Sequence, residues 1–127
     1  MSNRLEDLDV YNLSELFSDE IWFIVLEWDY FARDTVGKQL VRSVDSIGAN
    51  IAEDFGRYHY KENKNFCYFS RGSLIETKSW INKAKTRKLI SESQHAEYLN
   101  KMAIIHLKLN AYIKHIGSKI DPKNSNQ

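Results

Sequence analysis

The sequence contains few residues that cross-link a chain or interrupt its secondary structure. A single cysteine, Cys67, excludes a disulfide within the chain. One proline, Pro122, and five glycines among 127 residues leave long stretches without a breaker. These absences predict a fold of long regular elements that is held together by a hydrophobic core.

The chain also lacks any long apolar run. The longest run, Ile21 to Leu26, is far below the roughly 20 residues that span a bilayer. The first residues, MSNRLEDLDVYNL, have neither the basic nor the apolar region of a signal peptide. We therefore expect no membrane span and a cytoplasmic location. Residues 1–120 are long enough to form one compact domain, and the polar end, residues 121–127, is expected to be disordered.

Apolar residues recur at steps of three and four along most of the chain, which is the period of one buried helix face. Such stretches lie at about residues 10–31, 35–55, 61–88 and from 91 onward. Four amphipathic helices with short loops bury their faces most simply as an antiparallel up-down-up-down bundle. The predicted fold class is therefore all-α, a four-helix bundle.

Two local signals indicate helix ends. Ser91 and Gln94 have the spacing of a capping box at the start of the fourth helix, and Gly56 is placed to end the second helix as a left-handed cap. The fourth helix carries the most regular apolar face of the chain, which consists of Tyr98, Met102, Ile105, Leu109, Tyr112 and Ile116. That regularity predicts a bundle seam.

The third helix has a less regular apolar face. Cys67, Leu74 and Ile81 stand at heptad spacing, and Phe69 and Ile75 are expected to widen the buried face. A cysteine in such a position is expected to be an inert core residue, because a reactive thiol needs an exposed, electropositive setting.

Two features predict close contacts beyond a simple bundle. The segment IWFIVL of the first helix, Ile21 to Leu26, is apolar on all sides, so we expect it to be buried on two sides and to make a subunit contact. Gly72 inside the third helix costs roughly 1 kcal/mol relative to alanine. A close approach of another helix should offset this cost, and Gly48 and Ala49 on the second helix are the expected partner.

Charge is distributed unevenly along the chain. Residues 1–60 contain 5 Lys/Arg and 12 Asp/Glu, whereas residues 61–127 contain 13 Lys/Arg and 5 Asp/Glu. One interpretation is a basic surface for nucleic acid; the other, which we favour, is that acidic helices of one subunit meet basic helices of the next.

A polar stripe lies beside the apolar face of the second helix and extends to the third. Its candidate residues are Arg42, Ser46, Asn50, Glu53, Arg57, Ser73 and Glu76. One interpretation is a small binding patch. We favour a partly buried network that fixes how the second and third helices register. If exposed, the i,i+4 pair of Glu53 and Arg57 would contribute only about 0.2–0.5 kcal/mol.

The densest basic cluster is predicted at the end of the third helix. It consists of Lys83, Lys85, Arg87 and Lys88, and such a cluster is a candidate contact for the phosphates of RNA or DNA. The alternative interpretation is that these cations complement the helix dipole and keep the bundle soluble.

Patterns typical of catalysis or metal binding are lacking. The four histidines include no pair at i and i+4, and Cys67 has no companion cysteine. No nucleophile, base and orienting group can be nominated together. We expect no metal, no cofactor and no enzymatic activity.

Two ordered blocks of the sequence form a recognisable pattern. The first block is Gln39-Leu40, Arg42-Ser43, Ser46-Ile47, Asn50-Ile51-Ala52-Glu53 and Gly56-Arg57, and the second is Phe66, Ser70, Gly72-Ser73 and Glu76. Together these blocks resemble the 23S rRNA intervening sequence proteins, also called S23-type proteins. Val41, Gly48 and Asp54 depart from the family pattern, in which arginine, proline and glycine are common there. The first and last of these changes weaken any basic patch on this helix.

The resemblance covers most of the chain and implies a left-handed four-helix bundle that assembles into a ring-shaped homopentamer. Such proteins are encoded in some bacteria within inserts in ribosomal RNA genes, and similar bundles act as accessory proteins that bind RNA or a reverse transcriptase. We therefore expect a non-enzymatic homo-oligomer that serves as an assembly or interaction protein. The alternative is an accessory protein that binds RNA or DNA through the basic surface of its third and fourth helices.

Overall fold

The computed structural model describes residues 4–59 and 65–120. This part of the chain contains no strand and is built from four long helices, α1 (Asp9–Leu26), α3 (Lys38–His59), α4 (Asn65–Thr86) and α5 (Glu92–Ile120). Three short elements accompany them: the 3-10 helix η1 (Leu5–Asp7), the single turn α2 (Tyr30–Ala32) and the π-helical segment η2 (Arg33–Gly37). The predicted all-α class with four helices is confirmed.

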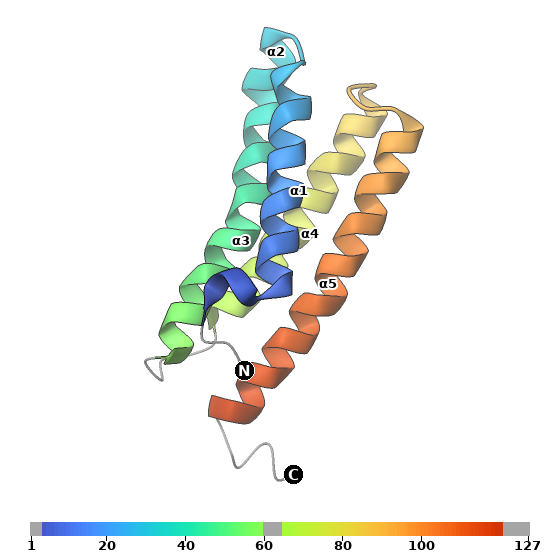
Figure 1. The fold of residues 1–127 in the computed structure, drawn as a ribbon. Coiled ribbons are helices and arrows are strands. Elements are labelled where there is room, and N and C mark those ends of the chain that lie inside the picture. The colour runs from blue at the N-terminus through green and yellow to red at the C-terminus, as the bar shows by residue number, and fades with distance from the viewer. Residues whose placement is uncertain (1–3, 60–64, 121–127) are drawn as a thin grey trace.

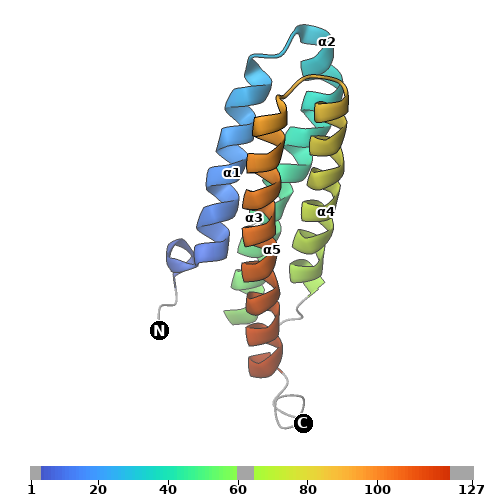
Figure 2. The same ribbon diagram turned by 90° about the vertical axis from the view of Figure 1, so that its right-hand side faces the viewer.

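The four long helices alternate in direction around one core (Figure 1). Each helix packs against two others, in the cyclic order α1, α3, α4, α5. Consequently α1 and α4 lie on opposite sides of the bundle, as Figure 2 shows. The acidic half of the sequence forms α1 and α3, and the basic half forms α4 and α5.

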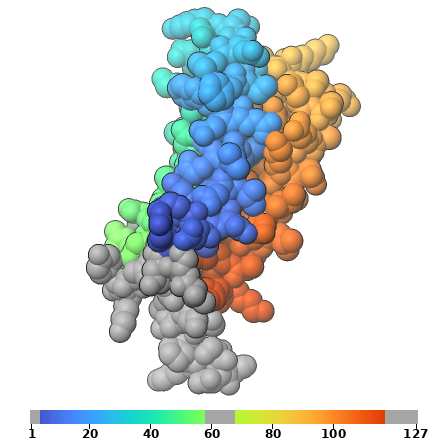
Figure 3. Space-filling view, viewed as in Figure 1, coloured from blue at the N-terminus to red at the C-terminus, as the bar shows by residue number. Residues whose placement is uncertain are grey.

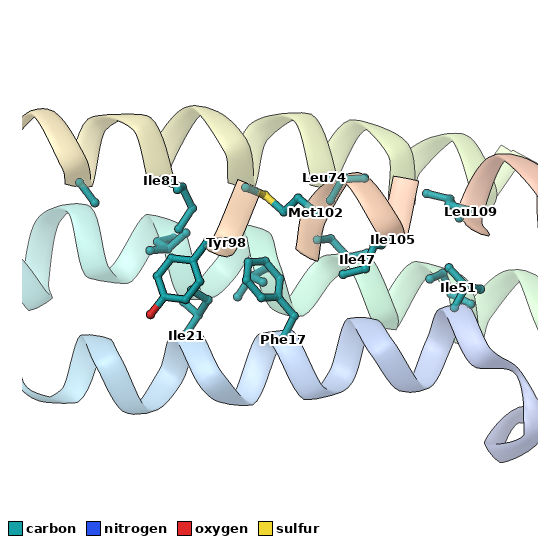
Figure 4. Close-up of a cluster of buried hydrophobic side chains, with 14 of the residues drawn as sticks. Phe17, Ile21, Ile47, Ile51, Leu74, Ile81, Tyr98, Met102, Ile105 and Leu109 are labelled. Atoms are coloured by element: carbon teal, nitrogen blue, oxygen red, sulfur yellow. The ribbon is translucent and has the colours of Figure 1, made fainter. Parts of the chain in front are cut away.

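The core follows the apolar periodicity of the sequence. Figure 4 shows side chains from all four long helices meeting along the bundle axis. The buried apolar residues include Phe17, Ile21, Leu40, Val44, Ile47, Ile51, Leu74, Ile81, Tyr98, Met102, Ile105, Leu109, Tyr112 and Ile116. Full burial of one such large side chain contributes about 1.5–3 kcal/mol, so this set supplies the main driving force for folding.

The capping box that starts α5 is confirmed in both directions. The backbone N–H of Gln94 donates to Ser91 Oγ at 3.0 Å, and the backbone N–H of Ser91 donates to Gln94 Oε1 at 2.9 Å. Two of the otherwise unpaired N–H groups at the helix start are thereby satisfied.

The boundary between the first two long helices was predicted wrongly. The first helix ends at Leu26 and does not reach Phe31, whose side chain is 76% exposed. The cause is Asp29, whose carboxylate accepts the backbone N–H of Ala32 at 2.9 Å and so starts a new helical turn. From there α2, η2 and α3 follow one another without a gap, so the helical stretch begins at Tyr30, not at Thr35.

Other helix ends also differ from the predictions. The backbone of α3 continues through Gly56 to His59, and Gly56 does not have a positive φ, so it is not a left-handed cap. The α4 helix ends at Thr86, two residues before the predicted end, and Lys88 adopts a φ of 62° in the turn that follows. The predicted start of this helix at Lys61, the core role of Cys67 and the disordered tail lie outside the described residues or side chains.

Among the glycines whose surroundings the structure describes, Gly37 and Gly48 lie at close approaches and Gly72 does not. A Cβ at Gly48 would lie 2.4 Å from Glu15 Oε1, and one at Gly37 would lie 2.6 Å from Val25 Cγ1. A Cβ at Gly72 would meet nothing within 4 Å. The expected packing of Gly72 against Gly48 is therefore wrong, because Gly48 faces α1 and Gly72 is exposed on the outside of α4.

Several large apolar side chains remain on the outer surface of the single chain. On α1, Leu16 is 67% and Phe23 is 66% exposed. On α4, Ile75 is 61% exposed and Phe69 is also exposed, so these two residues do not widen the buried face as predicted. No helix in the described part of the chain is long and apolar enough to cross a membrane.

Candidate functional site

Hydroxyl side chains occupy the interface between α3 and α4. Thr77 is fully buried, and its Oγ1 lies 3.0 Å from Ser43 Oγ and 2.7 Å from the carbonyl oxygen of Ser73. Ser70 Oγ donates across the interface to the carbonyl oxygen of Ile47 at 2.9 Å. These bonds satisfy buried polar groups and let two helix backbones approach closely.

Ser43 and Thr77 were not singled out from the sequence. A usable signal was present, because Thr77 stands between Leu74 and Ile81 at three- and four-residue steps on the buried face of α4. A polar residue in such a position needs a partner, and Ser43 supplies it.

Part of the predicted polar stripe is assembled between α3 and α4. The Arg42 guanidinium forms an ion pair with Glu76 Oε2 and also donates through Nε to Gln39 Oε1 at 3.2 Å. Glu76 Oε2 in turn accepts the indole N–H of Trp80 at 3.2 Å. This cluster is partly exposed, so it contributes little to stability.

The other members of the stripe are arranged differently. Ser46 Oγ and Asn50 Nδ2 each donate at 2.8 Å to a carbonyl oxygen one turn earlier in α3 itself. Glu53 is exposed and forms no hydrogen bond or ion pair with another described residue, so the expected pair with Arg57 is not formed. The carboxylate that α3 does bury is the neighbouring Asp54, which is 1% exposed.

An acidic cluster that sequence reasoning missed lies between α1 and α3. The Glu15 carboxylate fits beside Gly48, with Asp19 and Asp45 nearby, and Ser18 Oγ donates to the Asp45 carboxylate. Burial raises the pKa of Glu15, and the negative charges of Asp19 and Asp45 raise it further. Only Gly48, which was predicted to lie at a close approach of two helices, pointed to this part of the sequence.

A mostly apolar groove of about 180 Å³ lies between α1 and α5, on the face that Figure 3 presents. Its lining consists of Leu13, Leu16, Phe17, Glu20, Lys101, Ile104 and Ile105. Lys101 Nζ binds Glu20 at 2.5 Å and Glu97 at 3.2 Å, and the bond to Glu20 is the main cause of its raised pKa. Because Lys101 and Glu20, the charged residues that line the groove, pair with each other, the groove presents mainly apolar surface and no charged group that is free to act in catalysis.

Tyr98 is buried next to this groove. Its ring packs edge-on against Phe17 with centroids 5.9 Å apart. Burial, followed by the negative charges of Glu20 and Glu97, raises the pKa of Tyr98 to about 12. Such a phenol keeps its proton near neutral pH and is unsuited to act as a base.

The predicted basic cluster lies at one end of the bundle. Lys83 Nζ lies 5.9 Å from the centre of the Trp80 ring, and Lys85 pairs with Glu92 at 3.8 Å. Arg87 and Lys88 are exposed in the turn between α4 and α5. Figure 1 shows the α2 corner at the same end of the molecule, and this corner carries exposed acidic side chains, Glu27, Asp29 and Asp34.

In the part of the chain that the structure describes, no group of three or more His, Cys, Asp or Glu side chains is arranged to hold a metal ion. The arrangement as a whole is an all-α bundle whose polar groups mostly join one helix to the next. These features define a four-helix-bundle protein with apolar side chains on its outer faces.

The chain belongs to the 23S rRNA-intervening sequence protein family, whose model matches residues 6–111. The match spans α1, α3, α4 and most of α5, so it covers the helices that make the core. The family's description names no catalytic activity. No curated protein matches the sequence.

Proposed function

We propose that this protein is a non-enzymatic, homo-oligomeric assembly or interaction protein. The observation that carries the proposal is the apolar outer surface of α1, where Leu16, Trp22, Phe23 and Leu26 are all at least 46% exposed. Clustered large apolar side chains on an otherwise polar surface are typical of protein interfaces. A ring-shaped pentamer, which the family resemblance implies, is the specific form that we propose.

The separation of charge supports the same proposal. Acidic α1 and basic α4 lie on opposite sides of the bundle (Figure 2). Contacts between unlike surfaces of identical copies are head-to-tail and close into a ring when the rotation between neighbours permits. A cytoplasmic location and the absence of catalysis are part of the proposal.

Light scattering after size exclusion tests the proposal directly. At micromolar concentration the wild-type protein should elute as an oligomer with a mass several times the 14.9 kDa of one chain. A mass of one chain across the accessible concentration range would refute the proposal.

The alternative function is that of an accessory protein that binds RNA or DNA. The exposed cations at the end of α4 favour it, because phosphate contacts from lysine and arginine provide most non-specific affinity. The acidic side chains of the α2 corner, at the same end of the bundle, oppose it by repelling phosphates. Because these two features act in opposite directions, we rank nucleic-acid binding second to self-association.

The nucleic-acid alternative has its own test. Binding of single-stranded RNA should be steeply salt-dependent and should weaken when Lys83, Lys85, Arg87 and Lys88 are all replaced by glutamine. A control replaces Arg4, Arg33 and Lys38, exposed cations outside α4 and α5, by glutamine. RNA binding that depends neither on the salt concentration nor on the four substitutions at the end of α4 would refute a role for the basic cluster.

A further inference from the structure

The exposed position of Gly72 needs an explanation that the single chain does not provide. Gly72 lies in the middle of α4, where glycine disfavours the helix, and no atom within 4 Å requires the absence of a Cβ. On the same outward face, Tyr68 and Ile75 are 44% and 61% exposed. Large apolar side chains on both sides of a small one make a surface shaped to receive another side chain.

The spacing of these residues matches a specific packing geometry. Tyr68, Arg71, Gly72 and Ile75 stand at i, i+3, i+4 and i+7, which is the set that surrounds one hole in knobs-into-holes packing. The glycine deepens this hole, so that it fits a large side chain of a facing helix. We call these four residues the α4 hole.

We propose that the α4 hole receives Phe23 on α1 of a second copy of this chain. This inference rests on the proposed homo-oligomeric function and names its contact. Phe23 and Leu16 are seven residues apart on the outer face of α1, the same separation as Tyr68 and Ile75 on α4. Both are exposed, so each is available as a knob.

Charge favours α1 over the exposed apolar face of α5 as the partner of the α4 hole. Asp19 and Glu27 stand four residues before and after Phe23, whereas Arg71 is part of the α4 hole and Lys78 stands three residues beyond Ile75. The exposed large apolar residues of α5, Ile104 and Leu107, both lie within four residues of the exposed Lys108 and would bring like charges together. Opposite charges on facing helices favour pairing and set its register.

The contact joins two different surfaces of each copy. Because α1 and α4 lie on opposite sides of the bundle (Figure 2), every copy offers a free Phe23 on one side and a free hole on the other. The contact is therefore heterologous and continues from copy to copy until a ring closes.

Two substitutions block opposite sides of the same contact. Gly72→Leu fills the hole and Phe23→Ala removes the knob, and neither position belongs to the core of the single chain. Each should raise the dissociation constant of assembly by about thirtyfold or more, as for the loss of an interface hot spot. Ala103→Leu and Leu107→Ala, matched changes at exposed sites on α5, should leave assembly unchanged. Circular dichroism should report a folded protein for all four variants.

Mixing the two blocked variants gives the decisive result. The Gly72→Leu copy keeps an intact Phe23, and the Phe23→Ala copy keeps an intact hole, so an equimolar mixture should form a heterodimer and nothing larger. A mixture that stays monomeric, or either variant assembling as the wild type does, would overturn this contact and leave the proposed oligomer standing. A wild-type protein that is itself monomeric would overturn both.

A charge exchange tests the orientation of the contact. Asp19→Arg alone and Arg71→Asp alone should each weaken assembly, whereas the double variant should recover most of the loss because the two charges still face each other between copies. A double variant that is weaker than either single variant would overturn the pairing of these two faces.

Discussion

Replacing Gly37 by alanine should destabilise the fold because of one steric contact. The new Cβ would lie 2.6 Å from Val25 Cγ1 and 3.2 Å from the carbonyl oxygen of Ala32, whereas ordinary contacts are 3.4–4 Å. The Val25 side chain or the backbone around Gly37 must therefore shift. Overpacking of this kind costs about 1–3 kcal/mol, and the better helix propensity of alanine returns at most about 1 kcal/mol. We expect a net loss of about 1 kcal/mol.

Gly56→Ala is the matched control. Gly56 is also in a helix, but a Cβ there would meet nothing within 4 Å, so only the propensity gain remains. The difference between the two variants isolates the steric cost of Gly37, and we expect it to be about 2 kcal/mol in urea unfolding at one fixed protein concentration. Equal stability of the two alanine variants would refute the steric argument.

Three further predictions concern single side chains. A carboxyl group with a raised pKa favours folding at pH values below its ordinary pKa, which is 4.5 for Glu15, and this contribution is lost as the pH rises through the raised pKa. Glu15→Gln should therefore flatten the dependence of stability on pH just above pH 4.5, and the variant should be more stable than wild type at pH 7. An unchanged pH dependence would contradict the raised pKa of Glu15. Glu53→Ala should change the free energy of unfolding by no more than about 0.5 kcal/mol, as exposed sites do, and a larger loss in urea unfolding would show that assembly buries it. Ser91→Ala should cost about 1 kcal/mol through loss of the helix cap, whereas the exposed neighbour Ser93→Ala should be neutral in the same thermal melts.

The regular parts of the fold were predictable because the apolar period decides which face of each helix is buried. The seam from Tyr98 to Ile116 and the capping box at Ser91 follow from spacing alone, and both are confirmed. The end of α1 was not predicted, since neither glycine nor proline marks it. Asp29 was the available signal, because its position three residues before Ala32 suits an N-cap.

Features of the candidate site depended on which helices become neighbours, and the sequence does not state this directly. Arg42 can pair with Glu76 only because α3 packs against α4. Glu53 and Arg57 were grouped only because their spacing places them on one face of the same helix. The π-helical turn η2 likewise has no local sequence signature. Tertiary packing determines these details, so periodicity alone identified the stripe but not its partners.

The two oppositely charged halves of the sequence already meet inside one chain. Lys101 of α5 pairs with Glu20 of α1, and Lys108 Nζ of α5 lies 3.8 Å from Asp9 of α1. Arg42 of α3 pairs with Glu76 of α4, with the two signs exchanged between the halves.

These pairs are partly exposed, so each contributes at most about 1 kcal/mol to stability. The charges left over include those on the outer faces of α1 and α4, where the proposed contact between copies would join them. Because the fold rests on a buried apolar core and the contact adds exposed charge pairs to one apolar knob, rising salt should weaken the assembly without unfolding the chain.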